Sequence, residues 1–333
     1  MAGLAELNPF EDLPAGAEAF ASTAVPPTGS PDGPLEISVI IPAYHGAATI
    51  AGCLASVVLA TQGRRSEIIL VDSSGDGSSA IVREQFPQVT LILSPTRLSA
   101  GAARNAGIAR ARGTLLFFVD QDCQVPADWI AGLEKHFADP GVGGVGGSLG
   151  MLNPTARTGS AIYFLEFFRH LPTDSPPQRN PDFLLGCNCA YRADVLRSVS
   201  FPDQTLGEDV LVSHLVCRQG FDLVYDPSVE VLHTNRVGKR EFLRYNMKMG
   251  SASAAYQMAL RQPRSLPFLW FPALVFIAPF IILPMIFVRV LRCRRPYLKS
   301  FLLLLPVCFV GNLVWAAAFR RRVLASRRRH WLS

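Results

Sequence analysis

Acidic residues are missing from the carboxyl-terminal part of the chain. Residues 242–333 contain no aspartate or glutamate but 15 lysines and arginines, whereas residues 1–241 hold all 26 acidic residues and 17 basic ones. The net charge of +6 therefore averages an acidic body and a basic end. Because the basic residues flank long apolar runs instead of covering a soluble face, they indicate an anionic membrane surface as partner and argue against a nucleic acid.

The cysteines form no closely spaced framework. Seven of them lie at scattered positions, and Cys187 with Cys189 makes a C-x-C pair that is not a paired zinc motif. This pattern excludes a disulfide scaffold and favours a reduced, cytosolic setting for the body. Residues 1–35 also lack the features of a secretion signal, since they contain five acidic residues and no lysine or arginine. We expect residues 1–35 to be a disordered leader.

Short apolar runs alternate with helix-like segments from residue 37 onward. This alternation is typical of βαβ units and predicts an α/β fold with a mainly parallel sheet flanked by helices. Because the carboxyl ends of parallel strands meet at one edge, the residues that follow the runs are expected to share one crevice. The apolar runs are 37–41, 67–71, 89–93 and 114–119, and the helix-like segments are 48–60, 78–86, 101–112 and 126–137.

Two carboxylates follow the fourth apolar run. Asp120 and Asp122 come directly after residues 114–119, at the expected ligand-binding edge of the sheet. Magnesium takes oxygen ligands and is commonly shared between one or two carboxylates and substrate phosphates. The pair therefore predicts a divalent cation and a phosphorylated substrate. Alone, the same residues also fit a polar cap between a strand and a loop.

Residues 138–235 show a less regular pattern, with clustered glycines and a proline-rich patch at 172–181. A stretch of this length without clear elements favours a lid or an acceptor-binding region. Within it, Glu208 and Asp209 open an apolar, helix-like segment. Acidic residues at a helix start also interact favourably with the helix dipole, so a simple capping pair is the alternative interpretation.

The carboxyl-terminal part contains one amphipathic and two apolar segments. In residues 240–258, basic side chains fall on one helix face and apolar ones on the other, which fits either a membrane-surface helix or a core-facing helix. The runs 266–288 and 302–319 are long enough to cross a membrane. Two full spans would place their basic flanks on opposite sides, which the positive-inside rule disfavours. A hairpin that dips in and returns, or one interfacial helix, would avoid this, and the sequence does not choose.

In combination, the motifs resemble those of family 2 glycosyltransferases of the GT-A fold, over residues 37–235. Each motif is weak alone, but their order and spacing are specific. The matching segments are Ile37-Ser-Val-Ile-Ile-Pro-Ala-Tyr44, Val71-Asp72-Ser-Ser-Gly-Asp-Gly77, Gly101-Ala-Ala-Arg-Asn-Ala-Gly107, Asp120-Gln-Asp122, Gly186-Cys-Asn-Cys-Ala-Tyr-Arg192 and Gly207-Glu-Asp209.

The resemblance implies a nucleotide-sugar site at the sheet edge. Asp72 would accept hydrogen bonds from the N–H groups of the base. Two residues at a helix start, Arg104 and Asn105, would contact phosphate or sugar hydroxyls. The nucleotide pocket would be lined by Pro42, Ala43 and Tyr44.

The resemblance also implies a metal centre and a general base. Asp120 and Asp122 match the metal and sugar-phosphate motif, with Asp122 the direct ligand of Mg2+ or Mn2+, and His233 would be a further metal or diphosphate contact. Inverting transfer needs a base for the acceptor hydroxyl, and the resemblance gives this role to Asp209, with Glu208 beside it. The secondary candidates for sugar or acceptor contacts are Asn188 and Arg192.

The chain departs from the processive synthases of cellulose and hyaluronan, because no Gln-x-x-Arg-Trp follows Asp209. We therefore expect a single sugar to move from a nucleotide-diphosphate donor to a lipid-linked, polysaccharide or other membrane-proximal acceptor. The alternatives are a non-catalytic nucleotide-sugar-binding scaffold and a sugar nucleotidyltransferase, although the first loop lacks the basic, glycine-rich triphosphate grip. The catalytic domain is expected to be cytoplasmic on a membrane-associated protein. The expected divisions are the 1–35 leader, a 36–235 GT-A domain, a 236–265 amphipathic interfacial helix and a 266–333 membrane-associated helical hairpin with a basic tail.

Overall fold

A computed structural model describes residues 35–203, 207–235, 238–260 and 265–330. The expected disordered leader lies, except for Leu35, outside these described residues. Side chains are described up to residue 327.

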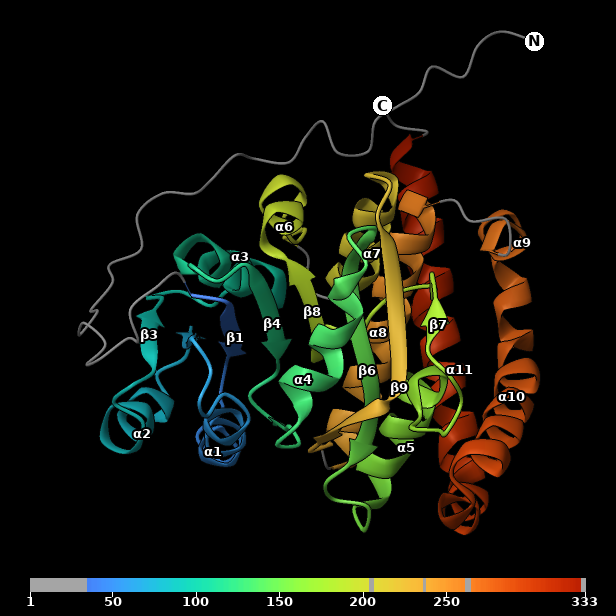
Figure 1. The fold of residues 1–333 in the computed structure, drawn as a ribbon. Helices are drawn as coiled ribbons and strands as arrows, with labels where there is room; N and C mark the ends of the chain where they lie inside the picture. Colours follow the sequence, from blue (N-terminus) through green and yellow to red (C-terminus); the bar gives the residue numbers. More distant parts are fainter. Residues whose placement is uncertain (1–34, 204–206, 236–237, 261–264, 331–333) are drawn as a thin grey trace, which may run out of the picture.

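One sheet of nine strands forms the centre of the described chain (Figure 1). Its order is β3-β2-β1-β4-β8-β6-β9-β5, and β7 pairs with β9. The first four strands in this order are parallel, β8 runs antiparallel to both of its neighbours, and β6 is parallel to β9. The strands are β1 (Ile37–Ala43), β2 (Ser66–Asp72), β3 (Thr90–Leu93), β4 (Leu115–Val119), β5 (Cys123–Gln124), β6 (Val142–Met151), β7 (Gln178–Arg179), β8 (Asn188–Arg192) and β9 (Asp222–His233). The predicted mainly parallel sheet is confirmed.

Helices cover both faces of this sheet, which explains why its strands are apolar along their length. Val39 and Ile41 of β1 point into one core with α1 and α4, whereas Ile40 points into a second core with α3, α6 and α7. The close packing of α3 against β1 depends on Gly107, where an added Cβ would lie 2.4 Å from the Ile40 side chain. The helices named here are α1 (Ile50–Ala60), α3 (Ala100–Arg110), α4 (Trp129–Glu134), α6 (Ala193–Val199) and α7 (Glu208–Arg218); α2 (Ser78–Gln85) follows β2.

The region expected to be irregular contains two of the longest strands, β6 and β9. The glycines in β6 made this strand hard to recognise in the sequence. They occur where neighbouring groups approach the backbone too closely for a side chain. A Cβ on Gly144 would lie 2.5 Å from the Tyr191 ring, and one on Gly147 would lie 2.2 Å from the Val229 carbonyl oxygen. The glycine cluster therefore allows close packing within the sheet, where the sequence pattern indicated a loop.

The carboxyl-terminal helices pack against the side of the sheet domain (Figure 1). The amphipathic helix α8 packs against α11, and its expected place at a membrane interface stays a prediction. Its Gly250 lies so close to α11 that a Cβ would be 2.1 Å from the Trp315 carbonyl oxygen, and its Ser253 accepts a hydrogen bond from the Trp315 indole. The elements here are α5 (Arg157–Phe167), α8 (Lys239–Leu260), α9 (Leu266–Trp270), the 3-10 turn η4 (Pro272–Ile277), α10 (Ala278–Cys293) and α11 (Leu298–His330).

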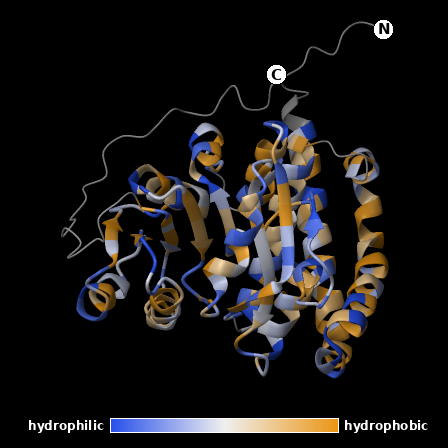
Figure 2. Ribbon diagram, viewed as in Figure 1, coloured by the Kyte–Doolittle hydropathy of each residue, from blue (hydrophilic) through white to orange (hydrophobic). Residues whose placement is uncertain are grey.

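Two of these helical segments, Pro272–Cys293 and Arg295–Arg327, are long and apolar enough to cross a membrane, by length and composition alone. Only 28% and 33% of their most apolar windows are buried inside the protein. Figure 2 shows the outer helix α10 as largely hydrophobic, and Phe280 on it is 68% exposed. On α11, Leu303 is 72% exposed. The expected pair of long apolar helices is therefore present, and its outer surface is hydrophobic.

Candidate active site

A cavity of about 1170 Å³ opens at the carboxyl ends of the parallel strands. It gathers residues that lie far apart in the sequence, as expected for one edge of a parallel sheet. Of the predicted site residues, nine line it, namely Pro42, Ala43, Tyr44, Arg104, Asp120, Asp122, Glu208, Asp209 and His233.

Arg104 is the buried centre of the polar end of this cavity. It is only 2% exposed, and its guanidinium donates to Asp120 Oδ1 at 2.8 Å and to Glu208 Oε1 at 2.6 Å. A third bond goes to the Gly186 carbonyl oxygen at 3.2 Å. Burial alone would lower the pKa of Arg104, but the charges of Asp120 and Glu208 raise it above its ordinary value. Arg104 therefore stays charged and joins two carboxylates from different elements, and its expected contact with phosphate or sugar hydroxyls stays a prediction.

Asp209 lies next to this ion pair, at the first turn of α7. Gly207 precedes the helix with a φ of 87°, a left-handed conformation that favours glycine. Asp209 remains partly exposed, whereas Glu208 is buried. Desolvation in the cavity and the neighbouring charge of Glu208 raise the pKa of Asp209 to about 7. A carboxylate with this pKa can take up a proton near neutral pH.

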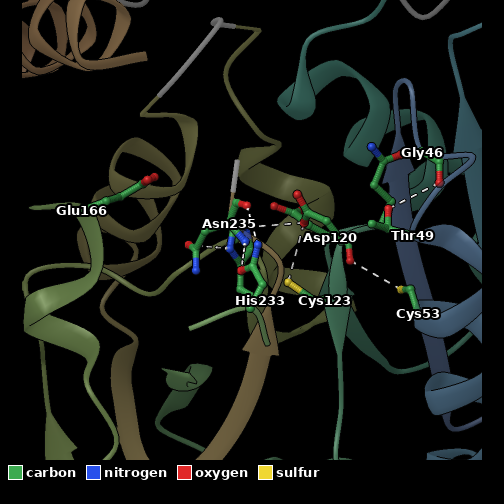
Figure 3. Close-up of polar contacts among 12 residues, drawn as sticks. Gly46, Thr49, Cys53, Asp120, Cys123, Glu166, His233 and Asn235 are labelled. Carbon is green, nitrogen blue, oxygen red and sulfur yellow. Dashed lines mark hydrogen bonds and ion pairs between the residues drawn. The ribbon is translucent and has the colours of Figure 1, made fainter. Parts of the chain in front are cut away.

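Asp122 and His233 face each other at the ends of two neighbouring segments. His233 Nε2 lies 3.5 Å from Asp122 Oδ1. The other ring nitrogen, Nδ1, lies 3.1 Å from Asn235 Oδ1 (Figure 3). Asn235 is 2% exposed and so can fix the ring with Nε2 toward Asp122. Metal-ligating histidines are commonly held in this way, and a carboxylate oxygen with an imidazole nitrogen suits Mn2+ and also accepts Mg2+.

Cys123 also lies at this centre, with its Sγ within 4.8 Å of the Asp122 and His233 donor atoms. Burial raises the pKa of Cys123 well above its ordinary value, mainly by desolvation. The thiol is therefore protonated at neutral pH and is a poor ligand for a hard cation. Asp122 and His233 remain the fitting pair.

Asp72 is buried at the end of β2, beside the cavity residue Ser73. Its Oδ1 accepts bonds from the Ser74 backbone N–H at 2.8 Å and from the Ser74 hydroxyl at 2.7 Å. Its Oδ2 has no hydrogen-bond partner among the described residues. A buried carboxylate oxygen without a donor is unfavourable, so Asp72 retains the capacity to accept from a ligand.

Three residues predicted to contact the ligand are not among those that line the cavity. Asn105 bonds the Phe201 backbone through both its amide groups, at 2.7 and 2.8 Å. Asn188 accepts from the Trp129 indole and donates to two backbone carbonyl oxygens. Arg192 donates to the carbonyl oxygens of three residues near the start of β6. Each side chain bonds other parts of the fold, and its expected ligand contact stays a prediction.

The structure adds residues that sequence reasoning missed. Gln121 accepts from the Tyr44 backbone N–H and donates to the Tyr44 carbonyl oxygen, both at 2.8 Å, which ties the first loop to the fourth. Arg97 stacks on the Tyr44 ring at 4.4 Å and lines the cavity. The position of Gln121 between two acids was a usable signal, whereas nothing in the sequence marked Arg97 or Asn235.

Comparison with known proteins places this geometry among sugar-transferring enzymes. The sequence profile described as Glycosyl transferase family 2 matches residues 38–200. The chain is 29% identical over 207 residues to the glycosyltransferase AglE of Haloferax volcanii, covering 60% of this chain and 67% of that protein. It is 32% identical over 107 residues to the dolichyl-phosphate beta-glucosyltransferase ALG5C of Trichomonas vaginalis, covering 29% of this chain and 32% of that protein. The aligned segments thus span only part of both relatives.

A solved structure resembles nearly the whole chain. The mannosyltransferase PcManGT from Pyrobaculum calidifontis, in complex with GDP-Man and Mn2+, superposes with a TM-score of 0.57 at 20% identity. The superposition covers 92% of this chain and 91% of that one. At this identity the likeness supports the fold, and the predicted GT-A architecture is confirmed.

Proposed function

The chain belongs to glycosyl transferase family 2, and from that premise we propose that it is a metal-dependent, inverting enzyme with Asp209 as general base. It would move one sugar from a nucleotide-diphosphate donor to a lipid-linked or membrane-proximal acceptor. The observation that carries the proposal is that Asp122 with His233, and Asp209, line the same cavity. A diphosphate leaving group and an acceptor hydroxyl need these two functions on either side of one sugar carbon.

The donor would bind at the strand ends. Pro42, Ala43 and Tyr44 line the base pocket, and the partnerless oxygen of Asp72 can accept from a base N–H group. PcManGT was solved with a nucleotide sugar and Mn2+, which supports this class of donor and a divalent metal. Bound between Asp122 and His233, Mg2+ or Mn2+ would neutralise the charge that develops on the diphosphate.

The chain's own residues would then position and deprotonate the acceptor. Asp209 takes the proton from the acceptor hydroxyl while that oxygen bonds to the sugar carbon and the carbon–diphosphate bond breaks. Products are the glycosylated acceptor, the nucleoside diphosphate and one proton, held on Asp209 until release. Arg104 bonds both Glu208 and Asp120. It would therefore fix the position of the base Asp209, next to Glu208, relative to the metal-binding segment that contains Asp120.

The hydrophobic outer surface of α10 and α11 supports the proposed class of acceptor. ALG5C is named for a dolichyl-phosphate substrate, and the aligned part of this chain supports a membrane-linked acceptor here. A catalytic domain on the cytoplasmic side fits the basic residues that flank the apolar helices, since these favour that side and anionic lipids.

The test is metal-dependent release of nucleoside diphosphate by the purified full chain, screened over a panel of sugar nucleotides. Release with Mg2+ or Mn2+ that is lost in Asp122→Ala and Asp209→Asn supports the proposal. Asp128→Asn is the matched control, because Asp128 is exposed and does not line the cavity. Donor binding without release from any donor would instead favour a nucleotide-sugar-binding scaffold.

A further inference from the structure

The cavity that holds the active site extends well beyond the polar residues. At about 1170 Å³ it exceeds the roughly 300–1,000 Å³ of ordinary small-molecule sites. Part of its lining comes from the carboxyl-terminal helices and is mainly apolar, with some polar members such as Ser253 and Asn312. We call this part the apolar lobe and define it by Met249 and Ala252 of α8, Ile281 and Met285 of α10, and Trp315 and Phe319 of α11.

Helix α8 connects the apolar lobe to the proposed base. Tyr256 lines the same cavity, one helical turn beyond Ala252. Its ring lies against Gly207, where an added Cβ would be 2.9 Å from Tyr256 Cδ1. Gly207 directly precedes Glu208 and Asp209. One face of α8 therefore leads from Asp209 into the apolar lobe.

The apolar lobe also adjoins the outer surface of the helical hairpin. Ile281 and Met285 line the cavity, yet they are 48% and 46% exposed. Phe280, which precedes Ile281 and does not line the cavity, is 68% exposed. The hydrophobic lining of the lobe is thus continuous with the surface that faces a bilayer if the hairpin is in the membrane.

Polar groups lie along the same cavity. Arg169 pairs with Asp182 at 2.7 Å, and both line the cavity, whereas Lys248 makes no ion pair among the described residues. A ligand with a polar head and a long apolar chain matches these surfaces, with the head toward Asp209 and the chain toward Trp315. A polysaccharide would leave the apolar lobe facing polar groups, which is unfavourable.

We infer that the apolar lobe binds the hydrocarbon chain of a lipid-linked acceptor, whose head group carries the reacting hydroxyl and which enters between α8, α10 and α11 from the bilayer. This inference rests on the proposed function, because it names the acceptor class of that same cavity. Each buried methylene group of such a chain adds apolar area removed from water, so the lobe would select for chain length. The bilayer would then supply the acceptor directly to the base.

The test uses bromine quenching of Trp315 fluorescence. The probe is dibromo-octadecyl phosphate, added to the full-length protein in phosphatidylcholine nanodiscs. A Trp270→Phe/Trp331→Phe background removes the exposed Trp270 and leaves Trp315 with the fully buried Trp129 as internal reference. Saturable quenching that disappears in Trp315→Phe is expected.

Two variants of α8 separate binding in the lobe from bulk partition into the bilayer. Ala252→Phe fills the lobe and should weaken the apparent affinity for the probe by about tenfold or more, because at least two methylenes lose their site. Ala255→Phe adds the same ring on the same helix, at a position outside the cavity lining, and should leave the affinity unchanged. Quenching that does not saturate, or that is identical in both variants, overturns the inference.

Diphosphate release, measured on the same samples, separates this inference from the proposed function. Release that requires Asp209, together with no saturable quenching, would overturn the lipid site and leave the transfer supported. Saturable, Ala252-dependent quenching without release from any donor would overturn the transfer and leave the lipid site supported.

Discussion

Replacing Arg104 by leucine removes the one cation that joins the two sides of the polar site. Its guanidinium bonds Glu208 at 2.6 Å and Asp120 at 2.8 Å while being 2% exposed. In Arg104→Leu, the buried Glu208 carboxylate would lose its paired charge, and a second carboxylate, Asp209, would remain beside it. The site would then contain mutually repelling acids without compensation.

The expected cost can be worked out from the exposure of each partner. Removing one member of a buried ion pair destabilises a protein by roughly 3–5 kcal/mol. The Glu208 side chain is 9% exposed, so loss of the Arg104–Glu208 pair should have a cost in this range. The Asp120 side chain is 35% exposed, so solvent screening makes the Arg104–Asp120 pair a small contribution to stability. We therefore expect Arg104→Leu to lower the free energy of unfolding by about 3 kcal/mol or more.

The assay is a double-mutant cycle by denaturant unfolding of the detergent-solubilised protein at pH 7.5, with Glu208→Leu and the double variant. The double variant should be more stable than Arg104→Leu alone, because the buried Glu208 charge is gone and only the partly exposed Asp120 loses its partner. The coupling should exceed about 1 kcal/mol. Arg110→Leu, at an exposed position of the same helix, is the control and should change stability little. A cost for Arg104→Leu below about 1 kcal/mol, or simple additivity in the cycle, would refute the ion-pair reasoning.

The other predictions concern the base, the metal and the helix contact. Asp209→Asn should abolish diphosphate release with donor affinity unchanged in a calorimetric titration, and wild-type kcat/KM should fall as the pH drops below about 7, where Asp209 gains a proton. Because the pKa of Asp209 is higher in the folded than in the unfolded state, the folded wild type loses stability as the pH rises from about 4 to about 7. In thermal unfolding, Asp209→Asn should therefore be more stable than wild type at pH 8 and equal to it at pH 4. Asn235→Ala should weaken Mn2+ binding about 10- to 100-fold in a metal titration, and equal affinity would remove Asn235 from the metal centre. Gly250→Leu should lower the Tm because α11 backbone lies 2.1 Å from the added carbon, whereas Ala255→Leu should not.

The first half of the fold followed from the sequence because its signals are local. Each early strand is a short apolar run, and parallel pairing then places Asp72, which ends β2, and Asp120, which follows β4, at one edge without further information. The sequence did not predict the β6 strand, because its glycines are required by contacts with Tyr191 and Val229, which are distant in the sequence.

The limits at the site have the same origin. Asn188 and Arg192 lie in a segment that resembles the family, but only their hydrogen bonds show that they hold backbone carbonyl groups. The two uses of an asparagine or arginine, a ligand contact and a structural bond, have the same sequence signal. Conversely, Asn235 acts through His233, and such an outer contact depends on tertiary geometry.

The central claim is that the metal site and the base act on one sugar carbon within the same cavity. Its most direct test is the position of Mn2+ in crystals of Asp209→Asn soaked with the donor that supports release. Anomalous scattering should place the ion between Asp122 and His233, on the diphosphate, with residue 209 on the opposite face of the sugar carbon. An ion bound elsewhere, or a sugar whose reacting carbon faces away from residue 209, would contradict the proposed chemistry.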